Sequence, residues 1–432
     1  MKVIRYRDAS FASKRRELTA PSSLFDPEIE QRTRTIIEAV RTRGDNALVE
    51  FTQRFDGAEL LPDQLAVSTA EWFSAAIKAE PELRAAVAEA SRNIAAFSRR
   101  SVRKAWTAKN SHGATVGEKF DPFDRVGIYI PGGTAPLVSS ALMTVTLAKV
   151  AGCREIVVCT PCGQTGEVNP ALLFALGEAG AAEGYRVGGA QAIAAMAFGT
   201  VTIPRVQKVF GPGNAYVVAA KRLLFGHVAI DLLPGPSEVL VLADDTAKAK
   251  FIAADMVAQA EHGSGHERVW LVTPSGALLK AVEKEIARQR STLARQDFVV
   301  QVLKNNAWLI QVKTLDDGIQ LANELAPEHC EIMTRNPAKV AGRIVTAGAI
   351  FLGDYSPTVL GDYVAGPSHE LPTGGAGRSF AGLTVDQFQR RTSVVEYSKT
   401  ALRKAQPAAE KFAAVEGLTA HGRSAAIRLE GR

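Results

Sequence analysis

Apolar strand segments alternate with helical segments from about residue 125 onward, and this alternation restricts the fold more than any other feature. The first strand is predicted at residues 126–130 and runs into Pro131-Gly132-Gly133. Further strands are predicted at 155–159, 185–187 and 208–210, with helices at 141–151, 170–180 and 215–224. A strand, a helix and another strand in succession favour parallel sheets flanked by helices.

A second series of the same kind follows, and the chain is long enough for each series to form its own sheet. Its predicted strands lie at 238–242, 268–273, 330–334 and 349–352, and its helices at 247–261, 276–290, 316–325 and 337–346. We therefore predict an α/β fold with two Rossmann-like parallel-sheet domains and small helical segments at both ends.

The composition is that of an ordinary soluble protein, because 46% of the 432 residues are hydrophobic and 22% are charged. The formal charge is +6, but Lys and Arg are scattered, and the short basic clusters at residues 14–16 and 99–104 carry little aromatic interleaving. Solvated helix faces explain such clusters better than nucleic-acid binding does. No apolar run approaches the roughly 20 residues that cross a bilayer. With only four cysteines, we expect a cytoplasmic protein that binds neither nucleic acid nor membrane.

Three glycine-rich turns, at Gly132, Gly188 and Gly211, each follow a predicted strand and precede a predicted helix. Such turns let a backbone approach phosphate and present the N–H groups of a helix N-terminus. None of them is the GxGxxG fingerprint, and tight turns that merely need glycine explain them equally well. If they bind a ligand, it should lie past the carboxyl ends of the strands.

Four of the seven histidines share a short segment with an acid or an amide. The pairs are Gln259 with His262, Glu328 with His329, Asp362 with His369, and Glu416 with His421. Imidazole and carboxylate are common ligands of catalytic zinc and common acid–base groups. We therefore expect these segments to build one site. Taken singly, each pair also has a simpler interpretation, such as a satisfied interfacial histidine or a capping glutamate.

The cysteines carry weaker signals. Cys330 beside His329 suggests a thiol nucleophile, but neighbouring side chains of a strand point to opposite faces, which argues against it. Cys159 and Cys162 have CxxC spacing, yet no second pair exists to complete a zinc site. A buried strand cysteine and a turn cysteine are the simpler interpretation, and His266, in a Gly/Ser-rich turn, is expected to be exposed.

Several long stretches, taken in order, resemble histidinol dehydrogenase from about residue 25 to 425. They are residues 127–133 (GIYIPGG), 187–195 (VGGAQAIAA), 211–214 (GPGN), 235–241 (GPSEVLV), 259–262 (QAEH), 326–329 (APEH), 361–363 (GDY), 369–373 (HELPT) and 418–421 (LTAH). The resemblance implies an enzyme with one zinc ion per subunit that oxidises L-histidinol to L-histidine with two NAD, through a bound aldehyde.

The resemblance also implies roles for individual residues. The zinc ligands would be Gln259, His262, Asp362 and His421, and the acid–base pair Glu328 and His329. Substrate would be contacted by these ligands and by Ser237, His329, His369 and Glu416, and NAD by Tyr129, Gln191 and Asn214. The family is a homodimer whose C-terminal segment reaches the neighbour's site, so Glu416 and His421 would act in the partner subunit.

On this basis the chain divides into four parts. They are an N-terminal segment 1–24, a first Rossmann-like domain of 25–107 with 235–380 that carries the zinc and acid–base residues, a second of 108–234 that contacts NAD, and a helical tail 381–432. An alternative is that the N-terminal helices pack with the second sheet.

Small departures from the family pattern occur at Pro234, Ser368, Cys330 and residues 263–266. None removes a predicted ligand or acid–base group. A paralogous zinc- and NAD-dependent dehydrogenase for another small primary alcohol therefore remains an alternative, as does a non-catalytic zinc- or nucleotide-binding protein. The presence of Glu416 and His369, which suit an amine- and imidazole-bearing substrate, favours histidinol.

Overall fold

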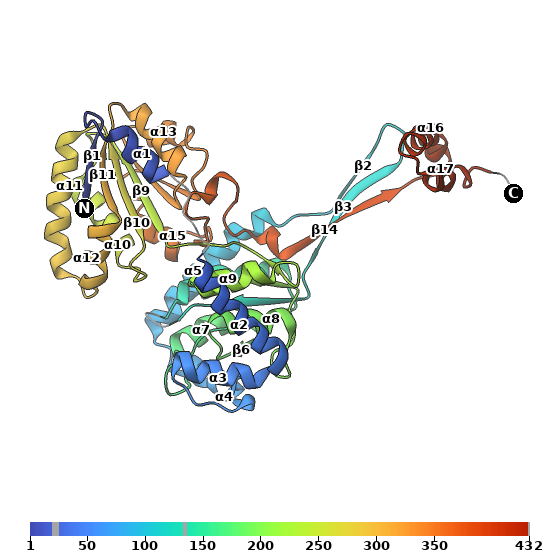
Figure 1. The fold of residues 1–432 in the computed structure, drawn as a ribbon, viewed down its shortest axis with the longest axis horizontal. Coiled ribbons are helices and arrows are strands. Elements are labelled where there is room, and N and C mark those ends of the chain that lie inside the picture. The colour runs from blue at the N-terminus through green and yellow to red at the C-terminus, as the bar shows by residue number, and fades with distance from the viewer. Residues whose placement is uncertain (20–25, 133–135, 431–432) are drawn as a thin grey trace.

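The computed structural model describes residues 1–19, 26–132 and 136–430, and it contains two parallel sheets and one antiparallel sheet (Figure 1). The predicted α/β fold with two parallel-sheet bodies is confirmed. Gly133, which the sequence places in the turn after the first strand of the series, lies outside the described residues.

The larger parallel sheet has six strands in the order β1-β11-β10-β9-β12-β13. In that order they are Lys2–Arg5, Ala307–Gln311, Arg268–Thr273, Glu238–Ala243, His329–Met333 and Ala349–Leu352. Alternate residues of the central strand β9 face opposite sides, so Val239 and Val241 join one core cluster and Leu240 and Leu242 the other.

Helices cover both faces of this sheet. On the face of Val239 lie α10 (Ala249–Ala260), α11 (Gly276–Gln289) and α12 (Gln296–Asn305). On the face of Leu240 lie α1 (Phe11–Thr19), α13 (Leu315–Leu325) and α14 (Pro337–Ala341). The short helix α15 (Thr358–Tyr363) follows β13 and packs near α10. The sequence pattern did not predict β1, β11 or α12.

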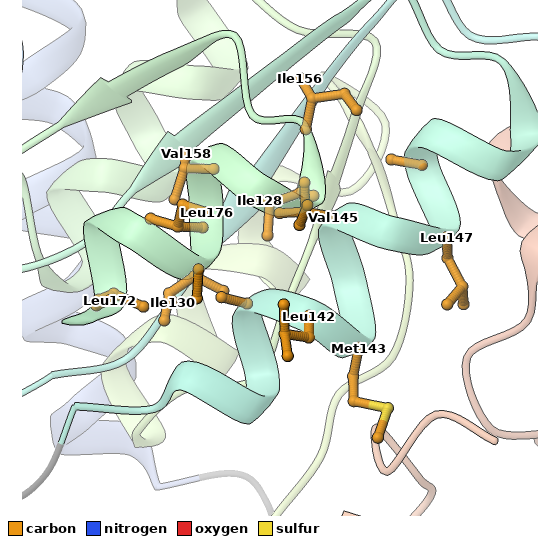
Figure 2. Packing of buried hydrophobic residues seen from close by; sticks show 14 of the residues in the cluster. Ile128, Ile130, Leu142, Met143, Val145, Leu147, Ile156, Val158, Leu172 and Leu176 are labelled. Carbon is orange, nitrogen blue, oxygen red and sulfur yellow. The ribbon is translucent and has the colours of Figure 1, made fainter. Parts of the chain in front are cut away.

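The smaller parallel sheet has five strands in the order β6-β5-β4-β7-β8. They are Glu183–Tyr185, Glu155–Cys159, Arg125–Tyr129, Lys208–Phe210 and Ala229–Ile230. One face is packed by α6 (Val138–Ala151) and α7 (Pro170–Ala179), and the other by α8 (Gly189–Phe198) and α9 (Ala215–Leu224). Figure 2 shows Leu142 and Val145 of α6 close to Ile128 and Ile130 at the end of the central strand.

The helices before residue 100 pack on this smaller sheet, which differs from the predicted grouping of residues 25–107 with 235–380. They are α2 (Pro27–Arg43), α3 (Asp45–Asp56), α4 (Thr69–Lys78) and α5 (Pro81–Ser98). Their position has a physical cause, because α6, α7 and α8 are apolar around most of their circumference. A helix of that kind must be buried on its outer side as well, and α2–α5 supply that outer layer.

A long arm extends from the two bodies (Figure 1). Its stem is an antiparallel sheet of β14 (Gln389–Glu396), β3 (Thr115–Pro122) and β2 (Trp106–Lys109), and its tip is formed by α16 (Lys399–Val415) and α17 (Thr419–Ala426). The tail 381–432, predicted to be helical, is therefore corrected to a strand followed by two helices. Residues 106–122, which the prediction divided between the first domain (to 107) and the second (from 108), instead form the rest of this stem. No helix among the described residues is long and apolar enough to cross a membrane.

Candidate active site

A cavity of about 1640 Å³ lies between the two parallel-sheet bodies. Its walls come from both of them, and the following predicted site residues line it: Asn214, Ser237, Gln259, His262, Glu328, His329, Asp362 and His369. Eight of the twelve residues proposed from the sequence therefore converge on one space, although they lie up to 155 positions apart, from 214 to 369.

The residues from the six-stranded body gather at the amino ends of its strands. Glu238 opens β9, His329 opens β12, and Glu328 directly precedes it. Gln259 and His262 lie at the end of α10, which runs back antiparallel to the strands. Asp362 lies in the last turn of α15, after β13. Strand beginnings and the ends of returning helices therefore build this wall.

Glu328 is buried, and its carboxylate Oε2 accepts the backbone N–H of Glu238 at 2.7 Å. Burial raises the pKa of the Glu328 carboxyl well above its usual range, and the nearby acids Glu238, Asp362 and Glu370 act in the same direction. A carboxyl group with a raised pKa holds a proton more readily than an ordinary carboxyl group, which suits a general acid–base group.

His329 is buried beside it, and its Nδ1 lies 3.0 Å from the backbone oxygen of Glu238. Because a carbonyl oxygen can only accept, Nδ1 carries the proton and Nε2 presents its lone pair. Nε2 lies 3.7 Å from Asp362 Oδ1. Burial lowers the pKa of His329 despite the neighbouring Asp362 carboxylate. The imidazole is therefore a neutral base with a fixed tautomer, aimed at a carboxylate in the cavity.

Gln259 and His262 stand three residues apart at the end of α10, with Gln259 Nε2 3.4 Å from His262 Nδ1. Gln259 is buried and His262 is exposed to the cavity. The helix ends here and Gly263 follows with a φ of 102°, in the left-handed region that favours glycine. Both side chains therefore leave the helix on the same side, as the spacing predicts.

Asp362 and His369 also meet, and His369 is held from several directions. Its Nδ1 lies 3.0 Å from the backbone oxygen of Asp362, and its Nε2 lies 3.1 Å from Ser140 Oγ and 3.5 Å from Glu370 Oε1. Burial opposes a charge on this ring, but the carboxylates of Glu370 and Asp362 outweigh burial and raise the pKa of His369. Ser140 lies in α6, so this contact joins the two bodies across the cavity.

The donor set on this wall fits a zinc ion. An amide oxygen from Gln259, an imidazole from His262 and a carboxylate from Asp362 are all accepted zinc ligands, and three protein ligands leave a position open. Within the described ranges, no group of three or more His, Cys, Asp or Glu side chains is arranged to hold a metal. This agrees with the donor set, because only two of the three are of those types and the fourth predicted ligand, His421, is elsewhere.

His421 and Glu416 lie at the tip of the arm, exposed, and neither lines the cavity of its own chain (Figure 1). The structure therefore separates these two predicted site residues from the eight that line the cavity. Apolar side chains on the arm are also exposed, including Val395 at 65% and Phe412 at 69%.

The predicted NAD contacts lie at the carboxyl ends of the five-stranded sheet. Asn214 caps α9 by accepting the N–H groups of Tyr216 and Val217, and it faces the cavity. Tyr129 and Gln191 do not line the cavity. Both side chains are buried near Gly189 at the start of α8. The Gly189 N–H donates to the Tyr129 hydroxyl at 3.0 Å. Gln191 Oε1 is a buried polar atom with no hydrogen-bond partner in the part of the chain that the structure describes.

Sequence reasoning missed residues that organise the wall. Glu238 supplies both backbone groups that hold Glu328 and His329, and its buried side chain pairs with Arg268 at 3.2 Å. Ser140 and Glu370 contact His369. A buried acid at the first position of an apolar strand, as in Glu238 before Val239-Leu240-Val241, was a signal that could have been used.

The weaker signals resolve simply. Cys330 belongs to the core on the face of the sheet opposite His329, and burial raises the pKa of its thiol to about 12. It is therefore no nucleophile at neutral pH. Cys159 and Cys162 are buried and unpaired, and His266 is exposed as expected.

Comparisons with known proteins agree over almost the whole chain. The family model for histidinol dehydrogenase matches residues 20–429. The histidinol dehydrogenase of Heliobacterium mobile is 45% identical over 408 residues, which is 94% of this chain and 95% of that protein. That of Geobacillus kaustophilus is 47% identical over 395 residues, 91% and 92% of the two chains. The crystal structure of histidinol dehydrogenase from Elizabethkingia anophelis aligns with a TM-score of 0.94 at 35% identity, covering 99% of this chain and 98% of that one.

Proposed function

The chain belongs to the histidinol dehydrogenase family, and we propose that it oxidises L-histidinol to L-histidine with zinc and two molecules of NAD, through bound L-histidinaldehyde. The observation that carries the mechanism is the neutral, tautomerically fixed His329 beside the buried carboxyl of Glu328 on one wall of the cavity. These are the two groups that the chemistry needs, because the reaction removes two hydrides and must also move protons and add water.

The residues that would hold the metal are Gln259, His262 and Asp362, with His421 of the partner subunit as the fourth ligand. Zinc bound there would supply Lewis-acid polarisation of the substrate oxygen, and NAD would accept hydride. Ser237, His369 and Glu416 of the partner subunit would bind the substrate, together with His329 and the ligands themselves. Tyr129, Gln191 and Asn214 would contact NAD.

Proton transfer falls to His329 in both oxidations. In the first, its Nε2 takes the hydroxyl proton of the alcohol while a hydride leaves the carbon that bears this hydroxyl group, which yields the aldehyde. In the second, Glu328 takes a proton from water as the water oxygen attacks the aldehyde carbon, and His329 returns the proton from the first oxidation to the aldehyde oxygen. The resulting gem-diol loses a hydride, and His329 takes a hydroxyl proton, which leaves the carboxylic acid.

We also propose a homodimer in which each arm completes the neighbour's site. Three features support this: Glu416 and His421 are exposed at the arm tip, apolar arm residues are exposed, and only three of the four predicted zinc ligands line the cavity of their own chain. Four unpaired cysteines are compatible with a reducing compartment such as the cytoplasm.

A second candidate is a dehydrogenase of the same chemistry for another small primary alcohol. The observation that favours it is that Pro234, Gly263, Ser264 and His266, where the chain departs from the family pattern, line the cavity. The zinc-loaded protein should form two NADH per L-histidinol with histidine as product. No turnover of histidinol, with zinc bound and the fold intact, would instead select this second candidate and call for a panel of primary alcohols.

The division of labour is tested by Glu328→Gln, which preserves size and an acceptor for the Glu238 N–H. It should slow oxidation of the aldehyde by about 10²-fold or more while oxidation of the alcohol falls much less, because only the aldehyde step needs activated water. Stopped-flow measurement of NADH formation from each substrate separates the steps. Equal loss in both would refute the assignment.

A further inference from the structure

A buried ion pair stands behind the predicted NAD side of the cavity. Lys221 lies in the middle of α9 and Asp231 directly follows β8, and the two side chains form an ion pair with exposures of 0% and 3%. No role for these residues follows from the proposed chemistry, because neither lines the cavity.

Both charged groups bind the backbone of one residue, Gly211. The Lys221 ammonium donates to the Gly211 carbonyl oxygen at 2.8 Å, and the Gly211 N–H donates to Asp231 Oδ2 at 2.7 Å. Hydrogen bonds to charged groups are about twice as strong as neutral ones. The pair therefore fixes the peptide groups on both sides of Gly211.

Gly211 is a position where the backbone has little freedom to move. Its φ is 109°, and a Cβ there would lie 2.0 Å from the backbone oxygen of Tyr129. The next three residues, Pro212, Gly213 and Asn214, line the cavity, and Asn214 then caps α9. Gly211 is thus the point where β7, the end of β4 and the cavity-lining loop 211–214 meet.

Stability alone does not account for such a pair, because a buried ion pair can often be replaced by apolar residues of similar size without loss. Its placement on the backbone of a cavity-lining loop suggests another use. We propose that Lys221 and Asp231 are positioning residues that hold loop 211–214 in the conformation that receives the nicotinamide dinucleotide. The proposal rests on the proposed use of NAD and deepens it, since it assigns the loop geometry to two residues outside the site.

Two double variants test the proposal in the full-length protein. Lys221→Met with Asp231→Leu removes both charges and both contacts to Gly211. Lys221→Met with Asp231→Asn is equally uncharged but keeps an acceptor for the Gly211 N–H. The dissociation constant of NADH is measured by its fluorescence in the absence of turnover, and histidinol binding, zinc content and melting temperature are measured in parallel.

The Met/Leu variant is expected to weaken NADH binding about tenfold or more, and the Met/Asn variant clearly less, because small misplacements of a binding loop have large effects. Histidinol binding and zinc content should stay within about twofold of the wild type, since the proposed zinc ligands and histidinol contacts lie on the other body and on the partner's arm. The Met/Asn variant retains one contact and supplies the comparison with the wild type should Met/Leu not fold.

Three results would overturn the proposal: NADH binding unchanged in Met/Leu, equal weakening in both variants, or parallel loss of histidinol and NADH binding, which would indicate a purely structural role. A wild-type protein that binds zinc and histidinol but not NADH would instead refute the proposed cofactor, and this inference with it.

Discussion

The arm predicts a specific result when two inactive chains are combined. His421 and Glu416 are carried away from their own cavity by β14, whose eight residues span about 26 Å in extended form, and then by α16. If each arm completes the partner's site, a chain with a damaged body and a chain with a damaged arm can complement one another. His262→Ala damages the body and His421→Ala damages the arm.

The size of the effect follows from counting sites. Random association of equal amounts makes about half of the dimers mixed, and each mixed dimer has one site built from an intact body and an intact arm, so about 25% of wild-type activity returns. If His421 served its own chain, every site in a mixed dimer would carry one lesion and no activity would return.

The assay is NADH formation from histidinol after the two zinc-supplemented variants are unfolded together and refolded, or are co-expressed with different tags and purified as mixed dimers. A mixture of His262→Ala with Asp362→Ala is the matched control, because both lesions lie in the body and no arrangement restores a site. Activity near background in the first mixture, with mixed dimers shown to be present, would refute the proposal that the arm acts in the partner.

Two further predictions concern stability. Burial raises the pKa of Asp56 to about 6, so its ionisation opposes folding, and stability is lost as pH rises from about 4 to about 6. Because the carboxyl is only partly shielded, Asp56→Asn should raise the free energy of unfolding by about 1 kcal/mol at pH 8 and by little at pH 4. Urea unfolding at the two pH values measures both effects. Equal effects at the two pH values would contradict the raised pKa of Asp56 as their cause. Gly211→Ala should destabilise by about 3 kcal/mol or more, whereas Gly113→Ala, which has a similar positive φ but open space, should lose only about 1–2 kcal/mol. Similar melting temperatures for the two variants would contradict the predicted clash with the Tyr129 carbonyl.

Much of the core could be predicted because turn and capping residues mark where its strands and helices begin and end. The strands at Glu155–Cys159, Arg268–Thr273 and Ala349–Leu352 and the helix Ala215–Leu224 match the predicted bounds. These strands are apolar runs that end in turns, and the helix begins at Asn214, an N-cap residue. Where the hydrophobic pattern of a segment agrees with its packing in this way, the sequence alone is enough to predict the bounds of the element.

The arm could not be predicted in the same way. In β14, none of the eight residues is buried and charged residues follow one another, so no alternation of apolar and polar positions marks a strand. Its pairing with Thr115–Pro122 joins residues about 270 positions apart. The packing of α2–α5 was equally hidden, because the need for an outer helical layer arises only once α6–α8 are seen to be apolar all round.

The sequence indicated which residues form the site, but not at which edge of each sheet they lie. Ligands of open parallel sheets are expected at carboxyl ends, and the glycine-rich turns of the smaller sheet obey that rule. In the larger sheet, Glu238, Glu328 and His329 lie at the amino ends of β9 and β12. One sheet therefore faces the cavity with its carboxyl edge and the other with its amino edge.

This arrangement explains why the two walls look so different in sequence. A carboxyl edge offers loops that precede helices, so it presents free N–H groups and suits a phosphate-bearing cofactor. An amino edge is reached by helix C-termini, where side chains such as Gln259 and His262 project beyond the last turn beside buried strand-opening residues. That edge provides side chains that can bind a metal or transfer a proton, rather than free backbone N–H groups. A hydride acceptor and a metal-held alcohol can then face each other across one cavity without competing for the same edge, and this requires two sheets set against each other.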